Sequence, residues 1–413
     1  MGRTVVMFAA GSRGDVQPFL ALGRVLARQG DAVRILASTR YQRLVSASGL
    51  EFWPLPADPS EIITSAEGQE LLASRNNPVA FIRSMSGVLR SRMRCVLDQA
   101  QAGAKGADLV LAPSLGFPGV HLSHHLRVPH AVVHFQPSQP TGMFPHPLTP
   151  AAQLAGRIGN RLSYDLIDLA ACLTFRESIN AWRRESLGLD PLSPLRALRE
   201  ARRATVLCAF SPTIVPRPAD WGPNVHLTGF WQHEQPQWEP PHRLVSFLEQ
   251  GSPPVYVGFG SMKTPDPEAT DLVIRTALRR AGLRGVLTGD PATSEDDMLV
   301  IDDTPHEWLF PRLAGVVHHG GAGTTASALR AGVPSLVCPF FGDQVYWAQR
   351  VYRLGAGPAP LPAAQLTVPS LAARLITLTN SVASTEVARR IGRALRAEDG
   401  TAQACRILKS VDR

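Results

Sequence analysis

The sequence predicts an α/β protein with two facing, doubly wound, Rossmann-like domains, each built on a parallel sheet. Short β-branched apolar runs alternate with segments of helical period along most of the chain, a rhythm that indicates parallel strands covered by helices. The rhythm restarts after a proline-rich stretch at 212–223, and 413 residues suffice for two or three domains. In such a pair, the ligand is expected between the domains, at the carboxyl ends of the strands.

The first half of the chain supplies the first expected sheet. Its strands are short apolar runs, at Arg3–Ala9, Ala32–Ala37, Phe52–Leu55, Leu109–Ala112, His130–Phe135 and Val206–Phe210. The segments between them have the spacing of helices, at 18–29, 41–48, 79–104, 119–126 and 154–187. Residues 136–150 contain five prolines, which exclude regular structure, and a loop of that length in a compact domain is usually functional.

The second half repeats the pattern after a linker. We expect the linker at the prolines of 212–223, with 235–241 as the alternative and a short strand at His226–Phe230 between the two. The later expected strands are Val255–Gly258, Arg284–Thr288, Met298–Ile301, Gly315–His318 and Ser335–Val337. The expected helices are 266–281, 322–331, 344–354, 368–380 and 384–409. The predicted domains are therefore 1–215 and 216–385, with a C-terminal helix in 386–413 packing back on the first domain.

Composition excludes several classes of protein. The longest apolar runs fall far short of the roughly 18 residues of a membrane helix, and the first ten residues lack a full signal-peptide core. We therefore expect a soluble, cytoplasmic protein with no integral membrane span. Lys and Arg exceed Asp and Glu by 42 to 34, but 39 of the 42 are Arg spread along the chain without dense basic blocks. The net charge of +8 thus suits an anionic small ligand and does not indicate a nucleic-acid partner.

Five cysteines are widely spaced and form no Cys-x-x-Cys pair. This spacing argues against a disulfide framework and against a cysteine-ligated zinc ion. We expect buried, reduced thiols.

A glycine-containing turn, Gly11-Ser12-Arg13-Gly14-Asp15, follows the first expected strand. It lacks the third glycine of the dinucleotide fingerprint, so NAD binding is disfavoured. Asp15 has two interpretations that its position alone does not separate. It is either the N-cap of the first helix or a general base at the carboxyl end of the sheet.

A second turn, 318–325 (HHGGAGTT), opens the helix expected at 322–331. Its glycines let backbone N–H groups approach a ligand, while a histidine and the hydroxyls of Thr324 and Thr325 add donors, which together form a diphosphate cradle. The absence of a following Gly-Lys-Ser/Thr excludes a P-loop, and the adjacent histidines have no further ligands nearby for a metal. A purely structural glycine turn is the remaining alternative.

Two further turns stand at strand ends. In 338–344 (CPFFGDQ), Asp343 and Gln344 offer acceptors and donors suited to sugar hydroxyls, or Asp343 only caps a helix. In 258–261 (GFGS), Ser261 is a possible phosphate donor, or the segment is a plain turn.

These motifs together resemble the GT-B UDP-glycosyltransferase family (family 1), in particular its sterol-glucosyltransferase-like and antibiotic-glycosyltransferase branch. The N-terminal signature is 11–18 (GSRGDVQP), and the C-terminal signature runs from 304–310 (TPHEWLF) through His319–Thr324 to Asp343 and Gln344. The resemblance covers essentially the whole chain, and it implies the GT-B fold and transfer of a sugar from a nucleotide sugar.

The resemblance also implies roles for single residues. The expected donor site comprises positions that match the family's binding positions for the diphosphate, for the sugar hydroxyls and for the nucleotide base. It also includes Ser12 and the start of a helix at Ala322. Its residues are Ser12, Ser261, Thr304, Pro305, His306, Trp308, His319, Gly321, Ala322, Gly323, Thr324, Asp343 and Gln344. Asp15 lies where plant members have a catalytic histidine and where this branch has aspartate, which favours the role of general base.

The region that matches the acidic partner of that histidine, 112–114, contains no acid in this chain, and an aspartate base needs none. A free Asp titrates near pH 3.9, so Asp15 is a weak base unless it is desolvated. His134 could assist it, or be a core histidine of its strand.

The resemblance implies an inverting hexosyltransferase whose co-substrate is a UDP- or dTDP-sugar, with no cofactor and no metal. The acceptor is expected to be an apolar, sterol-like or natural-product alcohol, held by segments that contain Phe81, Met85, Phe117, His134, Met143 and Phe144. Three alternatives remain open: a dTDP-deoxysugar transferase of antibiotic biosynthesis, a GT-B sugar-nucleotide epimerase or cell-wall GlcNAc transferase, and a non-catalytic helper.

Overall fold

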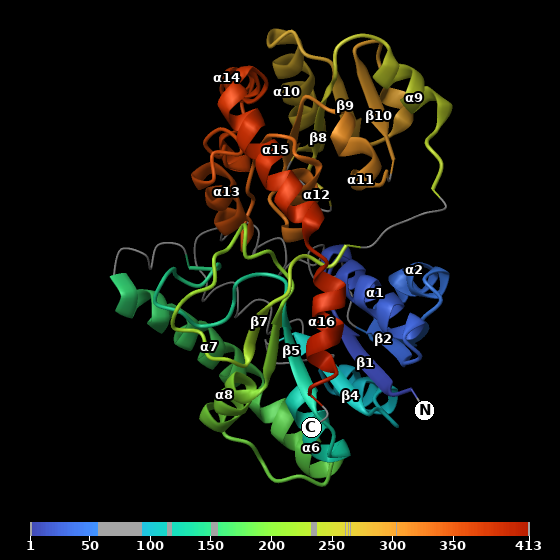
Figure 1. Cartoon of the computed structure of the whole chain (residues 1–413), viewed down its shortest axis with the longest axis vertical. Helices are drawn as coiled ribbons and strands as arrows, with labels where there is room; N and C mark the ends of the chain where they lie inside the picture. Colours follow the sequence, from blue (N-terminus) through green and yellow to red (C-terminus); the bar gives the residue numbers. More distant parts are fainter. Residues whose placement is uncertain are drawn as a thin grey trace. The chain divides into compact units, whose positions relative to one another are not determined.

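The chain forms two α/β units, each with its own parallel sheet (Figure 1). The computed structural model describes residues 2–56, 93–113, 118–149, 156–232, 238–260, 262, 264, 266–302 and 304–411. The first unit comprises residues 1–233 and 399–413, and the second comprises 234–398.

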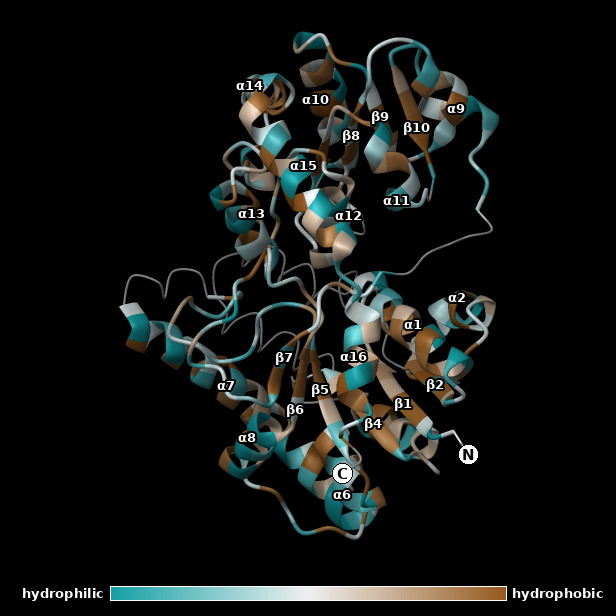
Figure 2. Ribbon diagram, viewed as in Figure 1, coloured by the Kyte–Doolittle hydropathy of each residue, from teal (hydrophilic) through white to brown (hydrophobic). Residues whose placement is uncertain are grey.

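The first unit is built on a sheet whose strands, in the described part of the chain, have the order β3-β2-β1-β4-β5-β6-β7. The strands are β1 (Thr4–Ala9), β2 (Ala32–Ala37), β3 (Glu51–Pro54), β4 (Leu109–Pro113), β5 (His130–His134), β6 (Thr205–Cys208) and β7 (Val225–Leu227). All pair in parallel. Strands buried on both faces explain the nearly continuous apolar runs in the sequence (Figure 2).

The domain boundary differs from the predicted one at 215/216. β7 is hydrogen-bonded to β6, so the first sheet continues past residue 215 and the second unit begins at 234. The prolines of 212–223 lie in the connection that brings the chain back to the sheet edge for β7. The alternative linker, 235–241, lies next to the observed boundary.

Helices cover both faces of the first sheet. They are α1 (Arg13–Arg28), α2 (Gln42–Ala47), the helix of residues 93–103, α6 (Gly119–Leu126), α7 (Gly156–Glu185), α8 (Pro194–Arg203) and α16 (Gly400–Leu408). Val5 and Met7 of β1 pack in the core on the side of α1, while Val6 and Phe8 pack on the opposite side with Trp182 of α7. This alternation follows from the two-residue period of a strand.

The C-terminal segment divides between the two units. The single helix expected at 384–409 is two helices, because the chain leaves helical geometry at Glu398 and Asp399 before α16 begins. α15 (Val382–Ala397) belongs to the second unit, and only α16 crosses back, where Ala404 and Leu408 enter the core beside Leu20 of α1. The guanidinium of Arg3 donates to the carbonyl of Leu408 at 3.1 Å, which fixes the end of that helix.

Shortening Leu408 to Ala is expected to destabilise the first unit. Its side chain is fully buried in the core shared by α1 and α16, so the change removes apolar contacts and leaves a cavity. We expect the free energy of unfolding of that unit to fall by about 2–5 kcal/mol in a denaturant titration. A loss well under 1 kcal/mol would mean that α16 contributes little to the fold.

The second unit is built on a parallel sheet of order β10-β9-β8-β11-β12 in its described residues. The strands are β8 (Val255–Gly258), β9 (Gly285–Thr288), β10 (Met298–Ile301), β11 (Gly315–His318) and β12 (Ser335–Val337). The remaining helices are α9 (His242–Glu249), α10 (Pro267–Arg280), α11 (His306–Leu309), α12 (Ala322–Ala331), α13 (Gln344–Arg353) and α14 (Val368–Asn380). α10 and α14 share the apolar core on one face of the sheet, while α9, α11 and α12 share the core on the other.

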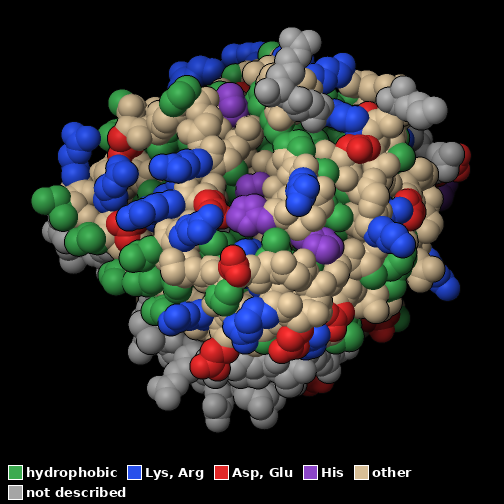
Figure 3. All heavy atoms as spheres, turned by 90° about the horizontal axis from the view of Figure 1, so that it is seen from below, with side chains coloured by type: hydrophobic (Ala, Val, Ile, Leu, Met, Phe, Trp, Pro, Cys, Tyr) green, Lys and Arg blue, Asp and Glu red, His purple; other side chains and the backbone are tan. Residues whose placement is uncertain are grey.

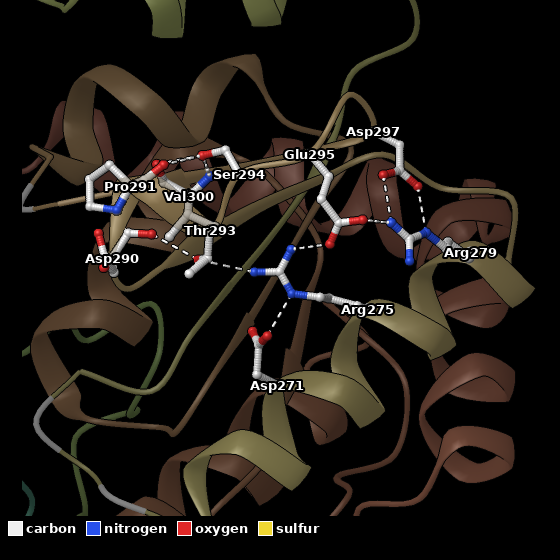
Figure 4. Close-up of polar contacts among 10 residues, drawn as sticks. All are labelled: Asp271, Arg275, Arg279, Asp290, Pro291, Thr293, Ser294, Glu295, Asp297 and Val300. Atoms are coloured by element: carbon white, nitrogen blue, oxygen red, sulfur yellow. Dashed lines mark hydrogen bonds and ion pairs between the residues drawn. The ribbon is translucent and has the colours of Figure 1, made fainter.

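Arginines of α10 tie that helix to the segment before β10 (Figure 4). Arg275 donates to Asp271 at 2.5 Å and to Glu295 at 2.8 Å, and Arg279 binds Asp297 at 2.9 Å. These contacts account for some of the many arginines as parts of the scaffold. On the molecular face that Figure 3 shows, Lys and Arg side chains are interspersed with Asp and Glu, as their scatter in the sequence indicates.

Among the described helices, none is long and apolar enough to cross a membrane.

Candidate active site

Three loops of the second unit meet at the carboxyl ends of neighbouring strands. His318 at the end of β11 pairs with Gly258 of β8 on one side and with Val337 of β12 on the other. Because parallel strands end at the same edge, the segments that follow them, 259–260, 319–321 and 338–343, lie around one place. All three contain motifs that the sequence singled out.

His318 is buried and supports the turn that follows it. Its Nδ1 accepts a hydrogen bond from the N–H of Gly320 at 3.1 Å, and burial holds the pKa of His318 well below its ordinary value. Gly320 has a φ of +95°, and a Cβ there would lie 2.7 Å from Val337 Cγ1, so only glycine fits. Of the two adjacent histidines, His318 thus shapes the loop.

His319 lies between glycines of two loops. A Cβ on Gly321 would come within 2.5 Å of the His319 Nε2 atom, and one on Gly260 within 3.2 Å of its Cε1 atom. The Nδ1 atom of His319 is buried and has no hydrogen-bond partner among the described residues. Burial lowers the pKa of His319 to about 4, so the neutral ring offers one N–H donor at neutral pH. A bound anion would complete its hydrogen bonding.

The start of α12 presents open backbone donors beside this histidine. Gly321 is the N-cap and supplies no side chain, so the first N–H groups of α12 have no acceptor within the helix. A Cβ on Gly323 would meet nothing within 4 Å, which leaves open space at the second helical position. Open N–H groups and the helix dipole make such a terminus an anion site.

Asp343 and Gln344 begin α13, and the structure separates their roles. The Asp343 carboxylate accepts a hydrogen bond from the Trp347 indole at 3.0 Å and is half-buried. The buried Gln344 side chain accepts from the N–H groups of Phe340 and Phe341 at 2.8 and 3.3 Å. Gln344 therefore holds the loop after β12, a role that the sequence motif alone does not reveal.

Aromatic contacts shape the segment that is expected to hold the nucleotide base, 304–308. His306 stacks on Phe310 with 4.3 Å between ring centroids, so its ring is part of the packing. Trp308 is half-buried, and the centroid of its ring lies 5.3 Å from the ring centroid of Trp238. The guanidinium of Arg312 lies 4.1 Å from the Trp308 ring centroid. Thr304 donates to the Asp302 carbonyl at 3.4 Å, and Pro305 is the N-cap of α11.

In the first unit, Ser12 and Asp15 form the start of α1. Ser12 is the N-cap, and Asp15 is the third helical residue rather than the cap itself. Asp15 Oδ2 accepts from the Ser12 N–H at 2.7 Å and from the Ser12 hydroxyl at 3.0 Å, which is the carboxylate half of a capping box. These bonds fix the carboxylate at the end of β1.

Burial raises the pKa of the Asp15 carboxyl above its ordinary value, while the two hydrogen bonds from Ser12 act in the opposite direction. A raised pKa makes the carboxylate a stronger base than a solvated aspartate. His134 is buried at the end of β5. Burial lowers its pKa to about 4, although a hydrogen bond with Gln139 acts to raise it. His134 is therefore a buried histidine of its strand, and its assistance to Asp15 stays a prediction.

Replacing Gly11 by Ala is expected to displace the Asp15 carboxylate. A Cβ at Gly11 would lie 2.2 Å from Asp15 Oδ2, whereas one at Gly14 would lie 3.5 Å from the Ser12 hydroxyl, an ordinary contact. If Asp15 takes part in a reaction, Gly11→Ala lowers its rate at least about tenfold, and the matched Gly14→Ala variant keeps it. Equal rates in both variants, measured under identical conditions, would contradict this placement.

The proline-rich loop 136–149 has no helix or strand, as predicted, but its backbone is pinned. Asp220 accepts from the hydroxyl of Thr141 and the N–H of Gly142, both at 2.7 Å. Asn160 of α7 donates to the carbonyl of Gly142 at 2.9 Å, and Ser163 accepts from the N–H of His146 at 2.8 Å. Sequence reasoning missed these anchors, because they come from the segment interpreted as a linker and from a distant helix.

The expected acceptor residues are only partly described. Met143 is exposed and Phe144 is half-buried on this loop, while Phe81, Met85 and Phe117, and also Ser261 of the donor site, lie outside the described residues. No group of three or more metal-binding side chains occurs in the part of the chain that the structure describes.

Family models match both units of the chain. The glycosyltransferase family 28 N-terminal domain matches residues 5–108, and the C-terminal domain described as erythromycin biosynthesis protein CIII-like matches residues 290–408. The two ranges include the Asp15 turn and the His319 turn respectively.

Sequence relatives cover nearly the whole chain. Two sterol 3-beta-glucosyltransferases of Arabidopsis thaliana are each 35% identical over 97% of this chain, which matches 66% and 64% of their lengths. A sterol 3-beta-glucosyltransferase of Leptosphaeria maculans is 32% identical over 99% of this chain and 29% of its own length. The chain thus spans slightly less than two thirds of the plant relatives and a smaller share of the fungal one.

Solved structures share the fold along the whole chain. The calicheamicin glycosyltransferase CalG4 superimposes with a TM-score of 0.68 and 21% identity, covering 100% of this chain and 98% of that one. SsfS6 from Streptomyces sp. SF2575, complexed with thymidine diphosphate, has a TM-score of 0.64 and 20% identity, covering 99% of each chain. Motifs, family models and solved structures agree, and the chain has the fold of the GT-B glycosyltransferases.

Proposed function

We propose that the protein is an inverting glycosyltransferase that moves a hexose from a nucleoside diphosphate hexose to a hydroxyl group of a sterol-like acceptor. The observation that carries the proposal is the anion-binding edge of the second unit. There, His319 has a buried ring nitrogen without a partner among the described residues, and it adjoins the open N–H groups of α12. The names of the sequence relatives support glucose transfer to the 3β-hydroxyl of a sterol.

In this proposal, the second unit binds the donor and stabilises its leaving group. Negative charge grows on the diphosphate as its bond to the anomeric carbon breaks. The α12 N–H groups, the His319 N–H and the Thr324 hydroxyl are donors for that charge. Because these groups supply the stabilisation, we propose that transfer needs neither a metal ion nor a cofactor.

The first unit supplies the base and the acceptor site. The acceptor oxygen attacks the anomeric carbon from the face opposite the diphosphate, and its proton passes to the Asp15 carboxylate. One displacement of this kind converts an α-linked donor into a β-glycoside. The raised pKa of Asp15 supports this role, since the base is stronger than a free aspartate.

UDP-glucose is the proposed donor, and a dTDP-sugar is the second candidate. The half-buried Asp343 carboxylate favours a fully hydroxylated hexose, because a deoxysugar would leave it with fewer partners. A dTDP-sugar is favoured by the fold neighbour solved with thymidine diphosphate.

The proposal is tested by incubating the purified chain with UDP-glucose or dTDP-glucose and a panel of acceptors. The panel contains a 3β-hydroxysterol, its 3-keto analogue and a polyketide alcohol, each with and without EDTA. We expect a sterol glucoside by mass spectrometry from UDP-glucose, unaffected by EDTA, and none from the ketone. An epimerised nucleotide sugar without any acceptor, or binding of UDP without transfer to any acceptor, would contradict the proposal.

A further inference from the structure

The loop 136–149 begins at the edge of the first sheet that carries Asp15. β5 pairs with β4 and β4 pairs with β1, all in parallel, so the ends of β5 and β1 lie at the same edge, two strand spacings or about 10 Å apart. Phe135, where the loop starts, packs edge-on against Phe19 of α1, with 5.1 Å between the ring centroids. Phe19 follows Asp15 by one helical turn, on the same side of α1. The start of the loop therefore lies beside the helix that carries the candidate base.

The middle of this loop is held by a carboxylate. Asp220 accepts hydrogen bonds from the hydroxyl of Thr141 and from the N–H of Gly142, both at 2.7 Å. The Thr141 oxygen in turn accepts from the N–H of Met143 at 3.1 Å. Asn160 of α7 donates to the carbonyl of Gly142 at 2.9 Å. These bonds fix the backbone of three successive residues, and the two that Asp220 accepts form the Asp220 clamp.

The Asp220 clamp is charged at neutral pH. Desolvation acts to raise the pKa of Asp220, but the hydrogen bonds from Gly142 and Thr141 outweigh it and hold the pKa below its ordinary value. Hydrogen bonds to an ionised carboxylate are stronger than those between neutral groups. Arg161 is exposed and its guanidinium lies 3.7 Å from the carboxylate, so this ion pair adds little. The strength of the clamp therefore lies in its two hydrogen bonds.

The clamp fixes the backbone that carries an exposed apolar side chain. Thr141 is fully buried, whereas the side chain of Met143 is 60% exposed. A flexible thioether adapts to irregular apolar shapes. A backbone that is already ordered lowers the entropy that a ligand must overcome on binding. This combination suits a loop that receives an apolar ligand.

We propose that Asp220 is a positioning residue of the acceptor site. Through Thr141 and Gly142 it holds the loop so that the side chain of Met143 contacts the apolar body of the acceptor. The inference rests on the proposed function, because it assigns the loop to the sterol-like acceptor of that function. Asp220 touches no reacting atom in this account, so it governs the affinity for the acceptor and leaves the chemical step unchanged.

The test uses the full-length chain and a 3β-hydroxysterol delivered from cyclodextrin. The Kd for the sterol is measured without any sugar nucleotide, and the KM values and kcat are measured for transfer from UDP-glucose. Asp220→Ala removes the clamp, and Thr141→Val removes one of its donors but keeps a branched side chain. In both variants we expect the acceptor Kd and KM to rise about tenfold, while kcat and the KM for UDP-glucose stay within about twofold.

A conservative variant and a matched control separate positioning from loss of the fold. Asp220→Asn should recover most of the acceptor affinity, because its amide can accept from Gly142 and donate to Thr141. Asp108 accepts the N–H of Thr4, also at 2.7 Å, at the amino ends of β1 and β4. Asp108→Ala should keep the wild-type acceptor affinity. If it weakens sterol binding as much as Asp220→Ala does, the effect is general destabilisation and the inference is wrong.

A double-mutant cycle tests whether the clamp acts through Met143. Met143→Ala should raise the acceptor Kd about fivefold. Adding Asp220→Ala should then raise it at most about twofold further, because the side chain that the clamp places is gone. Independent effects, which multiply to about fiftyfold, would contradict the inference.

Failure of the inference is distinguishable from failure of the proposed function. Transfer by the wild type with an acceptor KM that Asp220→Ala leaves unchanged would overturn only the inference. Sterol binding that Asp220→Ala weakens, by a wild-type protein that transfers no sugar, would overturn only the proposed function.

Discussion

Asn in place of Asp15 is expected to lower the turnover number for sterol glucosylation by about 10²–10⁴-fold, the usual contribution of a positioned general base. The amide has the same shape and can still accept from the Ser12 N–H, as the carboxylate does at 2.7 Å, so α1 should keep its N-terminal cap. What the variant loses is the ability to take the proton of the acceptor hydroxyl. The measurement is steady-state transfer at saturating donor and acceptor.

Two further measurements separate a lost base from a lost fold. The affinity for UDP should be unchanged in Asp15→Asn, because the proposed donor groups belong to the second unit. In the wild type, kcat/KM should fall as the pH drops through the pKa of Asp15, since the base works only when it is ionised. Burial raises that pKa, so the acidic limb should lie above the 3.8 of an unperturbed aspartate, and Asp15→Asn should lack the limb. Full turnover by the variant would contradict the base assignment.

Replacing His319 by Ala is expected to lower the turnover number by about 10²–10³-fold, as removal of a single donor to a developing oxyanion does. The reason is the loss of one N–H group from the proposed diphosphate site, where the His319 ring adjoins Gly260 and Gly321. Because burial keeps the pKa of His319 near 4, the lost interaction is that of a neutral donor in the free protein. The measurement is steady-state transfer at saturating UDP-glucose and acceptor.

His242→Ala is the matched control, since His242 is an exposed histidine of α9 in the same unit. It should retain full transfer and UDP affinity. A second variant, Gly321→Ala, places a Cβ within 2.5 Å of the His319 Nε2 atom and should reproduce much of the His319→Ala loss. If His319→Ala and His242→Ala transfer the sugar at the same rate, stabilisation of the diphosphate does not depend on His319.

Much of the fold could be predicted because each core strand is a separate apolar run. β2, β8, β10, β11 and β12 match their predicted bounds. α8 was missed although its leucines recur at helical spacing and Ser193 and Pro194 form a recognisable start. α9 was also missed, although α6, which has the same length of eight residues, was predicted with its observed bounds. The boundary at 215/216 was wrong because proline marks turns within a domain as readily as linkers between domains.

The glycine turns of the site could be predicted, since glycine at a strand end indicates that another group, from a ligand or from the protein, approaches the backbone closely. The partners of polar side chains could not. Asp15 is the capping-box carboxylate at the third helical position and not the N-cap that the sequence offered, and its role as the general base stays a prediction. The hydrogen bonds of Gln344 to Phe340 and Phe341 depend on the path of the loop, and the clamp of Asp220 on Gly142 spans 78 residues. Such contacts leave no local pattern in the sequence.

The most direct test of the proposed mechanism is the configuration of the new glycosidic bond. UDP-glucose, with its α-linked sugar, is supplied together with a 3β-hydroxysterol, and the anomeric proton of the product is observed by NMR spectroscopy. A single displacement assisted by Asp15 predicts the β-glucoside alone. An α-glucoside would require a retaining mechanism and would contradict the proposed roles of Asp15 and of the donor groups around His319.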